Sequence, residues 1–262
     1  MITLNTSSKM LFRNALPHST SSNTPIQKIW SQVRAYSSSN NASDQLKNAS
    51  ILFFWGNAQR DAKEFDSALT SFEKAFKIFS EVYGDEHPVV ATTLNNIGFT
   101  LGKLGHHEEA LQYKIQALDL YKELLGSNHP DIATSLNNIG HTLGKLGHHE
   151  EALQVKLQAL NLRKDLLGKK HLHIVISLNN VGSTYRDQRN YEEALQYQLQ
   201  ALEMLEKLPE NNFAVKITIL DNIATTLRDL SKPEEALKYK MRADKLKQEE
   251  KSSINNLNTN KE

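Results

Sequence analysis

Residues 126–159 read GSNHPDIATSLNNIGHTLGKLGHHEEALQVKLQA, and residues 84–117 read GDEHPVVATTLNNIGFTLGKLGHHEEALQYKIQA. The two stretches lie 42 residues apart and are nearly the same. A fixed internal period of this length indicates a repeat array, in which each unit touches only its neighbours. Weaker copies of the stretch lie on both sides. The sequence therefore predicts one long core that runs along an array, instead of a globular core.

The composition excludes several kinds of site and partner. A formal net charge of +1 over 262 residues gives no general argument for a nucleic-acid partner. The chain has no cysteine, which excludes a disulfide framework, a catalytic thiolate and cysteine-ligated zinc. No run of about 18 apolar residues is present, so we expect no transmembrane segment.

The first 44 residues differ from the rest of the chain. Residues 1–43 contain no Asp or Glu but carry Lys9, Arg13, Lys28 and Arg34. A basic, Ser-rich, weakly amphipathic leader is typical of a mitochondrial transit peptide, and it is equally typical of a disordered tail. We therefore predict for 1–44 a disordered leader that directs the protein to the mitochondrion, with a cytoplasmic protein as the alternative. Residues 252–262 are polar and patternless, which predicts a disordered tail.

The period divides the middle of the chain into five units, at 45–86, 87–128, 129–170, 171–212 and 213–251. Small residues recur at fixed places in the units, which allows two helices to approach closely. They are Gly56, Gly98, Gly140, Gly182 and Ala224 at one position, and Ala68, Ala110, Ala152, Ala194 and Ala236 at another.

Each unit is expected to form two helices. In the third unit, Pro130 suits the first position of a helix, because its missing N–H would have no partner there. Apolar residues then recur at spacings of three and four, and Gly147 ends that helix. The second helix is expected to start near His149 and to stop at Gly168. Its first turn contains acidic residues, which are favourable near the positive, N-terminal end of the helix dipole.

These positions carry a family resemblance. The pattern resembles the tetratricopeptide repeat in the order Leu136, Ile139, Gly140, Leu143, Gly147, Ala152 and Ala159. The 42-residue period is similar to that of kinesin light chain-type repeats. The resemblance covers about residues 45–251 and implies an all-α fold, an α-solenoid of helix-turn-helix repeats. The matching positions are mostly packing positions, so they do not identify a ligand.

One position departs from the family pattern. In the middle of the second helix the family has an aromatic residue, and the first unit has Phe72 there. The later units have Lys114, Lys156, Gln198 and Lys240 instead. The preceding residue, Tyr or Val in these units, is expected to take over the packing.

Asparagines recur on one face of the predicted first helices, and they are the leading candidates for partner binding. They are Asn96, Asn138, Asn180 and Asn222, with Asn95, Asn137, Asn179 and Asp221 beside them. An Asn side chain offers both a donor and an acceptor to the backbone of an extended peptide. The resemblance implies that first helices line the concave face and that such asparagines contact a bound peptide. The alternative is that one Asn of each pair bonds between adjacent helices and orders the stack.

Further candidates lie one and two helical turns beyond the asparagines. One turn on, the chain has Phe99, His141, Ser183 and Thr225. Two turns on, it has Lys103, Lys145, Arg186 and Arg228, which could form a basic strip for acidic side chains or a C-terminal carboxylate. An ordinary solvated helix end is the alternative for this strip.

The histidine pairs do not predict a metal site. His106–His107 and His148–His149 are adjacent residues on a turn, which point apart, and the i, i+4 spacing of zinc ligands is missing. No phosphate loop, nucleophile elbow or catalytic pair of carboxylates is recognisable, so we expect neither catalysis nor a cofactor.

The sequence thus predicts a non-catalytic scaffold that binds a peptide or partner protein in a concave groove. One alternative is a self-associating assembly factor, and another is a regulatory or accessory subunit of a larger complex.

Overall fold

The computed structural model describes the backbone of residues 25–168, 170–209 and 212–259, and side chains within 41–252. All regular elements of this described part are helices. They are α2 (Pro25–Asp61), α3 (Phe65–Tyr83), α4 (Pro88–Leu104), α5 (His107–Leu125), α6 (Pro130–Lys145), α7 (His149–Leu167), α8 (Leu172–Asp187), α9 (Tyr191–Glu206), α10 (Phe213–Asp229) and α11 (Pro233–Thr259). The prediction of an all-α fold is confirmed. None of these helices is long and apolar enough to cross a membrane.

The chain divides into two compact units, Met1–Lys47 and Asn48–Glu262. The described part of the first unit is the beginning of α2. The second unit holds the end of α2 and all the helices from α3 to α11.

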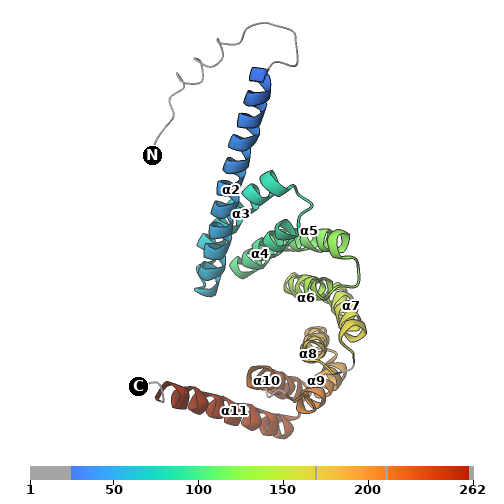
Figure 1. Ribbon diagram of the computed structural model, residues 1–262. Helices are drawn as coiled ribbons and strands as arrows, with labels where there is room; N and C mark the ends of the chain where they lie inside the picture. The colour runs from blue at the N-terminus through green and yellow to red at the C-terminus, as the bar shows by residue number, and fades with distance from the viewer. Residues whose placement is uncertain (1–24, 169, 210–211, 260–262) are drawn as a thin grey trace. The chain divides into compact units, whose positions relative to one another are not determined.

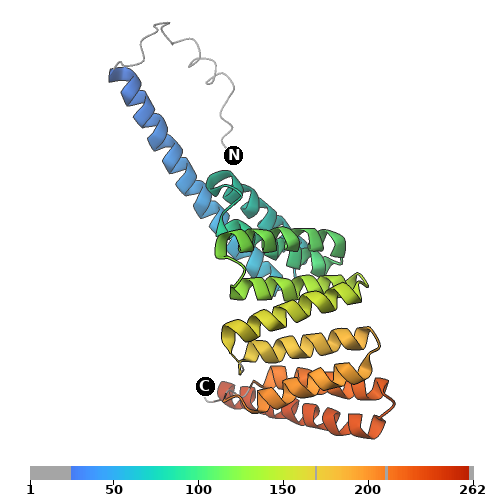
Figure 2. The same ribbon diagram turned by 90° about the vertical axis from the view of Figure 1, so that its right-hand side faces the viewer.

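The second unit is a stack of antiparallel helix pairs. The helices of each pair pack together, α4 on α5, α6 on α7, α8 on α9 and α10 on α11. Each second helix also packs on the first helix of the next pair, as α5 does on α6 and α9 on α10. Figure 1 shows the first helices α4, α6, α8 and α10 along the inner side of the curve, with α5, α7 and α9 along the outer side. Figure 2 shows the pairs stacked one on the next. This is the α-solenoid that the repeats predict.

The turns define where the helices begin and end. α6 begins at Pro130, α7 spans His149–Leu167, and Gly147 has a φ of 84° in the left-handed region, all as the sequence predicts. The structure adds a cap that the pattern did not reveal. The ring nitrogen Nδ1 of His129 accepts a hydrogen bond from the backbone N–H of Asp131 over 3.3 Å. His87 and His171 cap α4 and α8 in the same way, so the fourth unit keeps its cap although it lacks the proline.

The core lies between the helices of each pair and between successive pairs. The recurring alanines are buried, and Ala110, Ala152 and Ala194 are fully so. At Gly140 an added Cβ would lie 2.7 Å from Cγ of Lys156 and 3.1 Å from the carbonyl oxygen of Ala152. Only glycine therefore lets α6 lie this close to α7.

Both ends of the helical part differ from the boundaries expected from the sequence. α2 begins at Pro25, within the segment expected to be disordered, and α11 continues to Thr259. Ile29 and Val33, four residues apart in that leader, have the spacing of one helix face, and proline suits the first helical position. The residues after 251 contain no glycine or proline that would stop α11. Residues 1–24 and 260–262 lie outside the described part, and the transit-peptide hypothesis stays a prediction.

Candidate functional site

Two adjoining cavities lie on the inner side of the stack, over the first helices. Their volumes are about 390 Å³ and about 360 Å³. Phe99, Lys114, His141 and Lys145 line both cavities. We call the two cavities together the groove. The first is completed by Asn137, Asn138, Gly144, Lys156, Asn179, Asn180, Ser183, Asp187, Thr218 and Asn222, and the second by Gly102, Lys103, Gly105, His107 and Thr142.

The groove brings together most of the residues singled out in the sequence. Those that line it are Asn137, Asn138, Asn179, Asn180, Asn222, His141, Lys103 and Lys145. Four others, Asn95, Asn96, Arg186 and Arg228, are not among its lining residues. The candidates that line the groove therefore come from the second to the fifth repeats, mostly from the third and fourth.

The asparagines link successive first helices. Nδ2 of Asn180 donates to Oδ1 of Asn137 over 2.9 Å, and Nδ2 of Asn222 donates to Oδ1 of Asn179 over 3.0 Å. The second Asn of one pair thus bonds to the first Asn of the preceding pair. These are the bonds between adjacent helices that the alternative of an ordering role expects.

The hydrogen bonds between successive asparagine pairs, which we call the ladder of asparagines, do not continue to the second repeat. Asn96 accepts a hydrogen bond from Nη1 of Arg60 over 3.0 Å, since the first repeat has no asparagine pair. Among the described residues, the side-chain amide of Asn138 forms no hydrogen bond, although it is half-buried and lines the groove. Asn138 therefore keeps both a donor and an acceptor for a ligand.

Two buried lysines from the second helices lie at the floor of the groove. Lys114 and Lys156 are only 5% and 8% exposed. Nζ of Lys114 donates to Oγ1 of Thr142, and Nζ of Lys156 donates to Oγ1 of Thr184, each over 2.6 Å. Neither ammonium has a carboxylate within ion-pair distance among the described residues. The signal in the sequence was the replacement of the family's aromatic residue by lysine, which was interpreted only as a change in packing.

The residues equivalent to Lys114 and Lys156 in the later repeats have different hydrogen-bond partners. Oε1 of Gln198 accepts a hydrogen bond from Thr226 over 2.9 Å, and its Nε2 is buried without a partner among the described residues. Nζ of Lys240 lies 2.9 Å from Oδ1 of Asp221. Among the described residues, Lys240 is therefore the one lysine at this position of the repeat that has a carboxylate within ion-pair distance.

The electrostatics of the groove favour an anion. Burial, with a contribution from Lys103, lowers the pKa of Lys114 to about 8. Burial also lowers the pKa of Lys156, and Asp187 opposes this shift. The pKa of His141 is lowered by burial and then by the positive charges of Lys156, Lys114, Lys145 and Lys103. A bound anion would offset the cost of these unpaired positive charges.

The predicted basic strip is only partly realised. Lys103 lies 5.3 Å from the ring centroid of Phe99, on the groove side, and Lys145 lines both cavities. Nη2 of Arg186 lies 3.9 Å from a carboxylate oxygen of Asp187, and Nη2 of Arg228 donates to Oγ1 of Thr225. The strip therefore consists of its two lysines, to which the floor lysines add charge.

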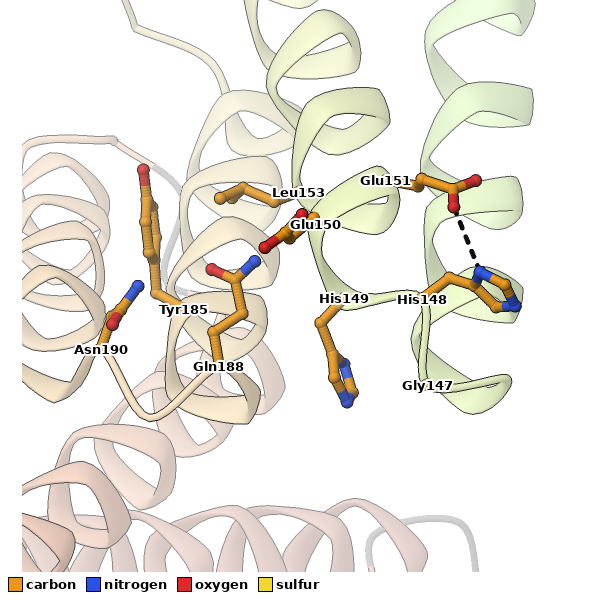
Figure 3. A pocket seen from close by; sticks show the side chains of 9 residues that line it. All are labelled: Gly147, His148, His149, Glu150, Glu151, Leu153, Tyr185, Gln188 and Asn190. Atoms are coloured by element: carbon orange, nitrogen blue, oxygen red, sulfur yellow. Dashed lines mark hydrogen bonds and ion pairs between the residues drawn. The ribbon is translucent and has the colours of Figure 1, made fainter.

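A third cavity, of about 720 Å³, lies at the turns of the third and fourth repeats (Figure 3). Nδ1 of His148 lies 3.1 Å from Oε1 of Glu151, and the ring of His149 points to a different side. Within the described residues, no group of three His, Cys, Asp or Glu side chains is placed to hold a metal ion. The rings of His148 and His149 thus lie in separate surroundings, and His107 of the other pair lines the groove.

The comparison with protein families agrees with this geometry. The tetratricopeptide repeat model matches residues 48–123, 91–165, 156–207 and 173–249, which together span most of the chain. The chain belongs to the tetratricopeptide repeat family. No curated protein matches its sequence.

Solved structures of other tetratricopeptide repeat proteins have the same fold. The nearly identical TPR-like repeats of a kinesin light chain from Podosopora anserina superpose with a TM-score of 0.67 at 14% identity, over 79% of this chain and 98% of that one. BtubC from P. vanneervenii superposes with a TM-score of 0.66 at 17% identity, over 82% and 90%. The Rap conjugation gene regulator of plasmid pLS20, in complex with the Phr* peptide, superposes with a TM-score of 0.64 at 20% identity, over 80% and 56%. At these identities the likeness establishes the fold alone.

Proposed function

We propose that this tetratricopeptide repeat protein binds an extended, acidic segment of a partner protein in the groove, without catalysing a reaction. Tetratricopeptide repeats generally mediate protein–protein interactions, so a protein or peptide is the expected class of partner. The Rap regulator of similar fold was solved with a peptide bound, which supports a peptide as the ligand here.

The observation that carries this proposal is the pair of floor lysines, Lys114 and Lys156. A buried ammonium without a carboxylate is costly, since only part of its lost hydration is replaced by the threonine hydroxyl. A Glu or Asp side chain of a ligand would supply the missing charge in a site that is largely shielded from water. Hydrogen bonds to charged groups are worth about 1.5–3 kcal/mol each, which is enough to select an acidic ligand.

The rest of the groove fits an extended backbone. Asn138 has an uncommitted amide that can donate to a peptide carbonyl and accept from a peptide N–H. The ring of Phe99 is partly exposed in the groove and offers an apolar contact. Lys103 and Lys145 lie at the rim of the floor and extend the positive charge along the groove.

The chain itself suggests the variant that tests this proposal. Gln198 occupies the register of Lys114 and Lys156 and bonds to the equivalent threonine, so glutamine fits this place in the fold. We expect the double change Lys114→Gln and Lys156→Gln to weaken binding of a fluorescent Glu-containing peptide by roughly 100-fold, measured by anisotropy. The melting temperature should not fall, because two unpaired buried charges are removed.

Two controls make the result specific. The same peptide with Gln in place of Glu should bind weakly to the natural protein and equally weakly to the double variant. Lys240→Gln, in the same register of the last repeat, should leave binding of the Glu peptide unchanged. Equal affinity of the natural protein for the Glu and Gln peptides would refute the acidic ligand.

A further inference from the structure

The two ends of the stack expose apolar side chains. At the beginning of the second unit, Ile51, Phe54 and Trp55 of α2 are each more than half exposed. We call these three residues the N-terminal face. At the other end, Leu237 and Met241 of α11 are also more than half exposed, and we call them the C-terminal face. Solenoid proteins generally end in repeats with a polar outer face, so two apolar ends require an explanation.

The residues of the N-terminal face occupy positions that, in the other repeats, contact the preceding repeat. Trp55 is equivalent, at steps of 42 residues, to Ile97, Ile139, Val181 and Ile223, all of which are buried. Ile97 shares a core cluster with Ala68 and Phe72 of α3, the second helix of the repeat before it.

The other two residues of the N-terminal face have the same orientation. Ile51 is equivalent to Ser177, whose hydroxyl lies 2.8 Å from Nη1 of Arg163 in the preceding second helix. Phe54 is equivalent to Asn180, which bonds to Asn137 of the preceding first helix. The whole N-terminal face therefore occupies positions that a preceding repeat covers elsewhere in the chain.

The C-terminal face includes a position that, in the other repeats, contacts the following repeat. Leu237 is equivalent to Leu153, and Met241 is equivalent to Leu157. Both of these leucines are partly buried against a core cluster whose members, apart from Leu160, all belong to α8 or later helices. In the register of Leu237, the internal residues Leu111, Leu153 and Leu195 are all half-buried. In the register of Met241, Ile115 and Leu199 are exposed, so the contact depends mainly on Leu237. No repeat follows α11 in the described chain to cover Leu237 and Met241 in this way.

We propose that the protein associates end to end, with the C-terminal face of one copy packed on the N-terminal face of the next. The contact would reproduce the packing of α9 on α10, which joins successive repeats within the chain. A second copy is the occupant that the register favours, because each face has the partner positions that the other one lacks. Such a contact joins different surfaces of the two copies, so it leads to longer assemblies unless they close into a ring. It does not depend on what the groove binds.

A pair of complementary variants tests this arrangement. Trp55→Glu disrupts the N-terminal face and keeps the C-terminal face, and Leu237→Glu does the reverse. Both side chains are exposed, so neither change should unfold the full-length chain. By light scattering at increasing concentration, the natural protein should exceed the monomer mass of 29.7 kDa, and each variant alone should stay at it.

Mixing the two variants gives the decisive result. The C-terminal face of the Trp55→Glu chain can still pack on the N-terminal face of the Leu237→Glu chain, and both outer ends of that pair are blocked. The mixture should therefore form a dimer and nothing larger. A mixture that stays monomeric would overturn the proposal, as would a natural protein that is monomeric at every concentration.

A matched control separates this contact from a general effect of charge. Ile115 of α5 is an exposed apolar residue of an internal repeat, away from both ends of the stack. Ile115→Glu should associate as the natural protein does. Association of either end variant by itself would show that a different surface joins the copies.

Discussion

The floor of the central repeats and the floor of the last repeat contain the same side chain in different surroundings. Lys156 and Lys240 have the same register, two periods apart. Lys156 is buried, bonds to a threonine and has no carboxylate within ion-pair distance among the described residues, whereas Lys240 is half-buried and pairs with Asp221. The residue that makes the difference is Asn137 in the third repeat, where the fifth repeat has Asp221.

The comparison teaches how one repeat position can serve two purposes. Where the first helix supplies a carboxylate, the lysine is satisfied within the chain and contributes to the stack. Where it supplies an amide, the lysine remains an unpaired charge in the groove, which a ligand can use. A single substitution should therefore convert one kind of floor into the other.

Asn137→Asp should have the largest effect of the single substitutions, because it gives Lys156 the partner that Lys240 already has. The new carboxylate can still accept the hydrogen bond from Asn180, so the ladder of asparagines is retained. We expect the Glu-containing peptide to bind roughly 30-fold more weakly, about 2 kcal/mol, in an anisotropy titration.

The reciprocal change provides the control. Asp221→Asn alters the charge at the end of the stack, outside the groove, and should leave peptide affinity unchanged. If Asn137→Asp bound the Glu peptide as tightly as the natural protein, Lys156 would not be part of the binding site.

A dependence on pH should follow from Lys114, whose pKa is lowered to about 8. A carboxylate ligand binds the protonated ammonium, so affinity for the Glu peptide should fall roughly tenfold between about pH 7 and pH 9. The Gln peptide should show no such fall. A flat profile for the Glu peptide would show that Lys114 does not contact it.

The stability of the unliganded protein should change with pH in the opposite direction. The folded-state pKa of Lys114 lies below its ordinary value of 10.5, so the unfolded chain binds more protons between about pH 8 and that value. The free energy of unfolding should therefore rise over this window. Lys114→Gln should lack this contribution, and denaturant titrations at several pH values measure the difference.

The smallest effect should distinguish the two kinds of asparagine. Asn180→Ala removes a hydrogen bond between repeats and should lower the free energy of unfolding by about 1 kcal/mol. Asn138→Ala removes no hydrogen bond among the described residues, so it should weaken peptide binding with little change in stability. Equal loss of stability in both variants would mean that Asn138 also orders the stack.

Most of the fold could be predicted from the sequence, because a repeat array is built from local contacts. The 42-residue period, Pro130, Gly147 and the spacing of apolar residues predicted helices that the structure confirms. The ends of the helical part could not be placed, since α2 and α11 extend beyond the residues that repeat.

The site was only partly accessible from the sequence. The asparagines could be placed on the first helices. The pattern could not show that Asn180 bonds to Asn137 while the amide of Asn138 has no hydrogen bond among the described residues. Arg186 and Arg228 lie one residue before Asp187 and Asp229, which are the positions equivalent to Lys103 and Lys145, and neither arginine lines the groove. Lys114 and Lys156 were noticed only as missing aromatics, because their ammonium groups reach the groove from the second helices.

The sequence by itself therefore determined the repeat, the helix pairs and the absence of cysteine chemistry. These depend on neighbours in the chain and on the residue types available. Only the tertiary structure decided which polar side chains satisfy one another and which stay available to a ligand. That decision depends on distances between successive repeats, such as the 2.6 Å from Lys156 to Thr184, which bring together residues far apart in the chain.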